Sequence, residues 1–146
     1  MELHLPVTAA LLSGVLLSLQ IVLMLSVGMY RNQAGKGVGV DGDIKLERLV
    51  RRHGNFAENA AIFVVTLALY EVLFGSGIGV LAAAIVFALA RLAHIIGFTS
   101  EAGSHLIGAD GAGRVYVLLR AAGAGLTALI SLVLGIALVI RIVISA

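Results

Sequence analysis

A polar stretch, ERLVRRHGNFAEN at residues 47–59, leads directly into an apolar segment. On a helix, steps of three and four residues place most of its functional groups on one stripe: Arg48, Arg51 or Arg52, Asn55 and Glu58. Guanidinium groups bind carboxylates through two parallel hydrogen bonds, so this stripe suits an anionic ligand. Asn55 and Glu58 can accept hydrogen bonds from an ammonium or amide group of the same ligand. The pattern favours a small zwitterionic peptide acid.

Two later apolar segments carry further charged groups at about the same level. Arg91 and His94 are three residues apart, and Arg120 follows about one turn inside the last apolar segment. Ionisable side chains inside membrane helices usually face the bundle interior and pair with one another. The excess charge is positive, and we expect Glu58 to be the main negative partner. Together these side chains predict a cationic pocket.

Three other roles compete with a binding pocket. Arginines and lysines near helix ends often extend to lipid headgroups, which is an equally good interpretation of Lys45, Arg48 and Arg51. A buried polar network can also serve only to fix how helices align. A transporter using Glu58 as a proton-coupled carboxylate is a third hypothesis, and the neighbouring arginines disfavour it.

The composition requires a membrane environment for the elements that hold these groups. Of the 146 residues, 60% are hydrophobic and 12% are charged, and the mean hydropathy is +1.10. A soluble domain of this size could not bury so much apolar surface. The formal net charge of +2 does not indicate nucleic-acid binding, and the absence of cysteine excludes disulfides and a thiolate nucleophile in the chain. The histidines lack metal-ligand spacing, so we predict no metal site.

Four apolar segments predict an all-α integral membrane protein with a four-transmembrane-helix bundle. The predicted helices cover about residues 5–29, 47–74, 78–99 and 115–143 of a single domain, 1–146. Each can cross a ~30 Å hydrocarbon core, which needs about 20 residues. Helices satisfy their own backbone groups, as lipid requires.

The lysines and arginines predict the orientation of the bundle. Most of them lie in or beside the two long loops, which share one side, and only Arg141 belongs to the other side. The positive-inside rule therefore places the loops in the cytoplasm and both termini outside. Tyr70 and Glu71, at the outer end of the second helix, are predicted interface anchors. Ladders of small residues predict close helix packing, either within the chain or between subunits: Ala10, Gly14 and Ser18, and Gly123, Thr127, Ser131 and Gly135.

ERLVRRHGNFAEN resembles the E-R-x-x-R-x-H-x-N-x-x-E signature of the MAPEG family, the membrane-associated proteins of eicosanoid and glutathione metabolism. RLAHIIGF at residues 91–98 is similar to the third-helix segment of that family. LRAAGAGLT at residues 119–127 is similar to the start of the fourth helix in bacterial members. The resemblance covers nearly the whole chain and implies a homotrimer in the bacterial inner membrane.

The same resemblance implies glutathione as co-substrate, bound between neighbouring subunits and open to the cytoplasm. Arg120 matches the arginine that stabilises the glutathione thiolate, and the remaining matches would hold the peptide: Arg31, Arg51, Asn55, Glu58, Arg91 and His94. The implied activity is that of a glutathione transferase or peroxidase acting on a lipophilic electrophile or a peroxide. Gly54 and Phe98 depart from the pattern, because many members carry a basic residue and a tyrosine there.

The alternative is a non-catalytic trimeric membrane protein. Its polar cluster would serve assembly, or the binding of lipid or another anion.

Overall fold

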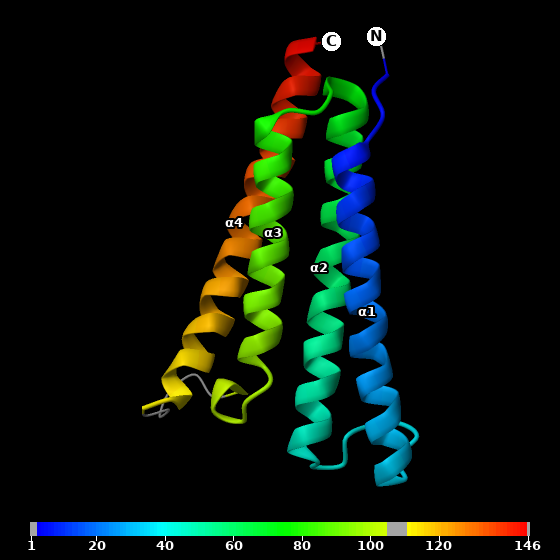
Figure 1. The fold of residues 1–146 in the computed structure, drawn as a ribbon, viewed down its shortest axis with the longest axis vertical. Coiled ribbons are helices and arrows are strands. Elements are labelled where there is room, and N and C mark those ends of the chain that lie inside the picture. The colour runs from blue at the N-terminus through cyan, green and yellow to red at the C-terminus, as the bar shows by residue number, and fades with distance from the viewer. Residues whose placement is uncertain (1–2, 105–110, 146) are drawn as a thin grey trace.

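The computed structural model describes residues 3–104 and 111–145, which form two long helical hairpins lying side by side (Figure 1). In chain order the elements are α1 (Val7–Ala34), α2 (Ile44–Phe74), α3 (Ile78–Gly97), a short 3-10 turn η1 (Ala102–Ser104) and α4 (Gly113–Ser145). Both termini and the tight α2–α3 turn lie at one end of the bundle, here called the terminal end. The two longer loops lie at the other, the loop end. No strand occurs in the described part, so the all-α prediction is confirmed.

Each of the four α-helices is long and apolar enough to cross a membrane. Their surfaces carry many exposed large apolar side chains, such as Leu11, Ile62 and Leu129, as expected where lipid is the solvent. Inside, the Phe63 and Phe87 rings stack with centroids 3.7 Å apart and join α2 to α3. The four-helix architecture predicted from hydropathy is therefore present.

Local capping explains where the helices exceed the apolar segments. α1 continues past the predicted end at residue 29 to Ala34, because a glycine follows there: Gly35 has φ 65° and its N–H bonds to the last turn. α2 begins at Ile44, ahead of the predicted 47, because the Asp43 carboxylate accepts a hydrogen bond from Leu46 N at 3.0 Å. α3 ends at Gly97, two residues before the predicted 99, and α4 extends past both predicted ends.

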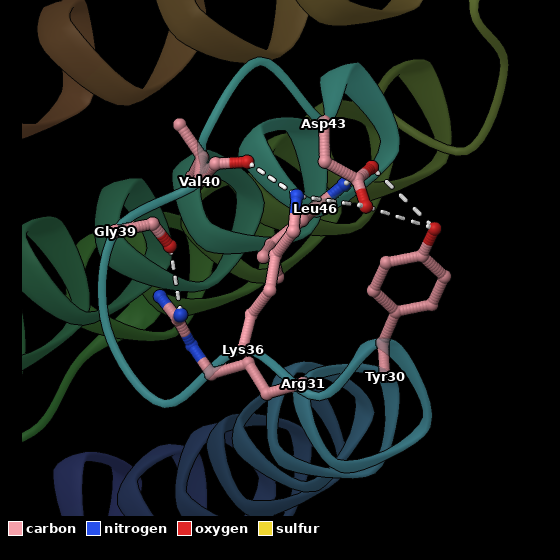
Figure 2. Close-up of polar contacts among 7 residues, drawn as sticks. All are labelled: Tyr30, Arg31, Lys36, Gly39, Val40, Asp43 and Leu46. Carbon is pink, nitrogen blue, oxygen red and sulfur yellow. Dashed lines mark hydrogen bonds and ion pairs between the residues drawn. The ribbon is translucent and has the colours of Figure 1, made fainter.

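The α1–α2 loop is held by polar contacts around Asp43 (Figure 2). The Lys36 ammonium lies 3.8 Å from the Asp43 carboxylate and donates to Val40 O at 3.1 Å. The Tyr30 hydroxyl donates to the same carboxylate. The hydrogen bond from Leu46 N–H, aided by Lys36 and opposed by desolvation, lowers the pKa of Asp43. The glycine-rich segment 35–39 thus belongs to a defined loop.

Two glycines allow α3 and α4 to approach closely at the loop end. A Cβ on Gly123 of α4 would lie 2.6 Å from both Ala90 O and His94 N of α3. A Cβ on Gly97 of α3 would lie 2.6 Å from Arg120 N of α4. Gly123 and the buried Thr127 therefore pack within the chain. Gly14, on the other ladder, is exposed and open.

At the terminal end, Glu71 binds the first turn of α1. Its carboxylate is 0% exposed and accepts hydrogen bonds from Thr8 N at 3.0 Å and Ala9 N at 2.9 Å. The Ser76 hydroxyl donates to it as well. Pro6 at the N-cap provides no side-chain hydrogen bond, so Glu71 supplies the missing cap and the negative charge that a helix N-terminus favours. The prediction that Glu71 is an interface anchor is wrong, because its carboxylate binds the helix and not the headgroups.

Gly123→Leu should destabilise the fold because the new side chain meets the α3 backbone, which cannot move aside easily. We expect a loss on the order of 1–3 kcal/mol, measured by thermal unfolding in detergent with circular dichroism. Gly125→Leu is the matched control, because a Cβ at Gly125 meets nothing within 4 Å. Equal losses in the two variants would contradict the close approach.

Glu71→Ala should loosen the first turn of α1, because two backbone N–H groups lose their acceptor. Each buried unpaired donor costs about 1–3 kcal/mol. Hydrogen exchange of the Thr8 and Ala9 amides should accelerate strongly, and Glu71→Gln, which keeps one acceptor oxygen, should have a smaller effect. Unchanged exchange in the alanine variant would rule out this capping role.

Candidate functional site

Arg91 is the centre of a polar cluster that joins three helices. The side chain lies on α3 and is 1% exposed. Its Nη2 donates to Asn55 Oδ1 of α2 at 2.9 Å, and its Nη1 donates to Thr127 Oγ1 of α4 at 3.4 Å. The guanidinium carbon lies 5.6 Å from the centroid of the Phe56 ring, which adds a cation–π contact. The structure thus brings the predicted Arg91 and Asn55 together.

Thr127 is a partner that the sequence did not indicate. As a member of a small-residue ladder it was interpreted as a packing residue, yet its hydroxyl accepts from Arg91 and donates to Gly123 O at 2.7 Å. The spacing does hold a signal, because Arg120 and Thr127 lie seven residues apart and share one helix face. That face points toward α3.

His94 and Arg120 meet one turn closer to the loop end. His94 Nδ1 lies 3.1 Å from Arg120 O. Since a carbonyl oxygen can only accept, the hydrogen is on Nδ1. In the neutral ring His94 Nε2 then carries a free lone pair, and that atom is buried without a partner. The imidazole is therefore held in one orientation by the α4 backbone.

The Arg120 guanidinium itself lies between a ring and a turn. Its Nη1 donates to Ser104 O of η1 at 3.2 Å, and its carbon lies 5.3 Å from the Phe98 centroid. Phe98 also makes an edge contact with the His94 ring. Within residues 3–104 and 111–145, no carboxylate forms an ion pair with Arg120. The side chain is half-buried.

Arg51 and Glu58 lie on the outside of the single chain. Arg51 Nε donates to Glu47 Oε1 at 3.1 Å, and both Arg51 and Glu58 are exposed. Glu58 is two residues from the buried Phe56, which places it about 200° around the helix. It therefore makes no ion pair with the internal arginines, in the part of the chain that the structure describes. The predicted stripe divides between an inner and an outer face of α2.

Arg31 lies in the last turn of α1 and contacts the α1–α2 loop. Its Nη1 donates to Gly39 O at 2.8 Å (Figure 2), close to the Asp43 contacts. Among the described residues, no hydrogen bond or ion pair links it to the cluster around Arg91. Of the seven predicted site residues, four contact one another in two pairs: Asn55 with Arg91, and His94 with Arg120.

A comparison with known protein families found a match for the chain. The model of the MAPEG family matches residues 9–140, nearly the whole chain and all four α-helices. A search of curated proteins found no significant match. A match over this length, on four helices able to cross a membrane, is decisive. The chain belongs to the MAPEG family.

Proposed function

We propose that the protein is a membrane-bound glutathione transferase or peroxidase that binds glutathione and stabilises its thiolate. The observation that carries this proposal is Arg120, a half-buried guanidinium without a carboxylate partner in the described chain. MAPEG membership supports it, because the family includes glutathione transferases. A fixed positive charge beside the sulfur favours the thiolate over the thiol.

The chemistry requires little beyond this charge. The glutathione thiol gives its proton to water, and the thiolate then bonds to a lipophilic electrophile while the leaving group departs with its bonding electron pair. With a peroxide, the sulfur bonds to one oxygen as the O–O bond breaks, and the other oxygen leaves and takes up a proton. A second glutathione then converts the sulfenic acid to glutathione disulfide and water. Arg120 stabilises the negative charge on sulfur before the attack. The absence of cysteine from the chain fits a reaction in which the co-substrate supplies the nucleophile.

The peptide part of glutathione would bind across a subunit boundary in a homotrimer. Arg51 and Glu58 support this, because both face outward from α2 and offer opposite charges to a zwitterionic ligand. Asn55, Arg91 and His94 would form the inner wall, and Arg31 would approach from the last turn of α1. One chain alone leaves the outer pair open, so a neighbouring copy would complete the site.

A lipophilic co-substrate has an apolar surface available near the cluster. A groove of about 420 Å³ lies between α1 and α2 and includes Phe56, whose ring contacts Arg91. Most of its lining is aliphatic, for example Leu16, Leu17 and Val64. A membrane-dissolved substrate could enter it directly from lipid.

The orientation in the membrane is also part of the proposal. Nearly all lysines and arginines belong to segments at the loop end, whereas Arg141 contacts Phe74, the last residue of α2, near the terminal end. The positive-inside rule then places the site at the cytoplasmic face of a bacterial inner membrane, with both termini outside.

Arg120→Ala should abolish the ultraviolet signal of glutathione thiolate in purified protein at neutral pH. Turnover of a lipophilic electrophile should fall about 100-fold, the usual cost of losing one charge-stabilising donor. Arg114→Ala, on an exposed site of the same helix, is the control and should keep both. A wild-type protein with no thiolate signal and no calorimetric binding of glutathione would favour the non-catalytic alternative.

The homotrimer is tested separately. Light scattering of the detergent complex, corrected for detergent, should give a protein mass three times the 15.1 kDa of one chain. Arg51→Ala and Glu58→Ala should weaken glutathione binding without changing that mass. A monomeric mass in several mild detergents would reject the shared site.

A further inference from the structure

Two arginines near the start of α2 carry buried donors that nothing in the described chain accepts. Arg48 Nη1 and Arg52 Nε are both buried without a hydrogen-bond partner. In the described part of the chain, the pair makes one side-chain hydrogen bond, from Arg52 Nη2 to Ser26 Oγ of α1 at 3.3 Å. Both side chains are half-buried, so Arg48 does not simply extend into the headgroup region as a free cation.

The charges of this pair are also uncompensated. Arg48 and Arg52 are four residues apart on one helix, so their Cβ atoms lie about 5–6 Å from each other and the like charges repel. In the described part of the chain the ion pairs are Lys36–Asp43 and Arg51–Glu47. Neither includes Arg48 or Arg52. Partly buried guanidinium groups in this situation require an anion.

Two other arginines of the chain, Arg51 and Arg91, have more partners, although Arg91 Nε is also buried without one. Arg51 has a carboxylate from Glu47 at 3.1 Å. Arg91 has two neutral acceptors and an aromatic ring. In the described chain, Arg48 and Arg52 together have one side-chain acceptor, the Ser26 hydroxyl that Arg52 binds. The difference indicates that their partner is a separate molecule.

The position of the pair suggests what that molecule is. Arg52 is eight residues into α2 from Ile44, about 12 Å along the helix. The pair therefore lies toward the loop end, ahead of the apolar segment. Basic side chains in that position attract anionic lipid headgroups. A phosphate group offers more acceptor oxygen atoms than a carboxylate does. It therefore suits two guanidinium groups with several free N–H donors better.

We infer that Arg48 and Arg52, with Ser26 beside them, form a phosphate-binding site on the α1-facing side of α2. The phosphate belongs to an anionic lipid headgroup or to free phosphate, and both sources present the same oxygen atoms. The site is independent of the proposed function, because it uses neither Arg120 nor its neighbours.

The test uses purified, delipidated full-length protein in detergent, unfolded thermally and followed by circular dichroism. One arm adds inorganic phosphate at constant ionic strength, with chloride as reference. The other adds phosphatidylglycerol, with phosphatidylcholine as reference. Ligand at 100 times its Kd should raise the Tm of the wild type by roughly 5–10 °C.

Arg48→Gln and Arg52→Gln should each lose most of this rise. In the reference conditions they should unfold no earlier than the wild type, because each removes a repulsion between like charges. Arg114→Gln, an exposed basic side chain, should respond like the wild type. Arg120→Ala should also respond normally, which separates this site from the glutathione proposal.

The outcomes distinguish the sources of the phosphate. A rise with phosphatidylglycerol alone assigns a lipid headgroup, and a rise in both arms assigns a site that free phosphate also enters. If a glutamine variant fails to fold, phosphorus NMR line broadening of phosphate or phosphatidylglycerol by the wild type still tests binding. No rise and no broadening in the wild type, or an equal rise in both glutamine variants, overturns the inference.

Discussion

A charged guanidinium in an apolar interior must be hydrogen-bonded, and Arg91 imposes that requirement on three helices at once. Asn55 of α2 and Thr127 of α4 meet it from opposite sides. These contacts fix how α2 and α4 align with α3, because a shift of one turn on any helix would leave the charge unpaired. Lipid gives helices no hydrophobic reason to prefer one alignment over another, so such contacts carry much of the specificity.

The close approach of α3 and α4 makes the contacts around His94 and Arg120 feasible. Gly97 and Gly123 face the opposite helix across a gap that a Cβ would overfill. This brings the Arg120 backbone within hydrogen-bonding reach of His94, and it leaves the guanidinium to stack on Phe98. Phe98 has no hydroxyl that could bind Arg120, but its ring makes a cation–π contact that positions the guanidinium.

Hydropathy and charge predicted the fold well, because a lipid solvent leaves few alternatives to membrane-spanning helices. They also predicted which residues are functional candidates, but not how those residues divide. Helical spacing gives the angle of each side chain around its helix, but it does not show which residue that side chain contacts. Glu58 and Arg91 were therefore expected to meet, whereas Glu58 lies on the outside. Glu71 was misassigned for the same reason: its partners are backbone amides of α1, 62 and 63 residues away, and backbone donors leave no signature in a sequence.

The two ends of the bundle differ in whether their buried polar groups have hydrogen-bond partners. At the terminal end the buried carboxylate of Glu71 is fully satisfied by α1 amides and Ser76. In the described part of the chain, the buried side-chain polar atoms without partners lie from the middle of the bundle toward the loop end: Gln20 Oε1, Arg48 Nη1, Arg52 Nε, Arg91 Nε, His94 Nε2 and Ser104 Oγ. Three of the six are guanidinium donors that lack an acceptor, and they belong to Arg48, Arg52 and Arg91. The buried carboxylate at the terminal end is therefore satisfied within the chain, whereas the unpaired guanidinium donors lie toward the loop end, as do both proposed sites.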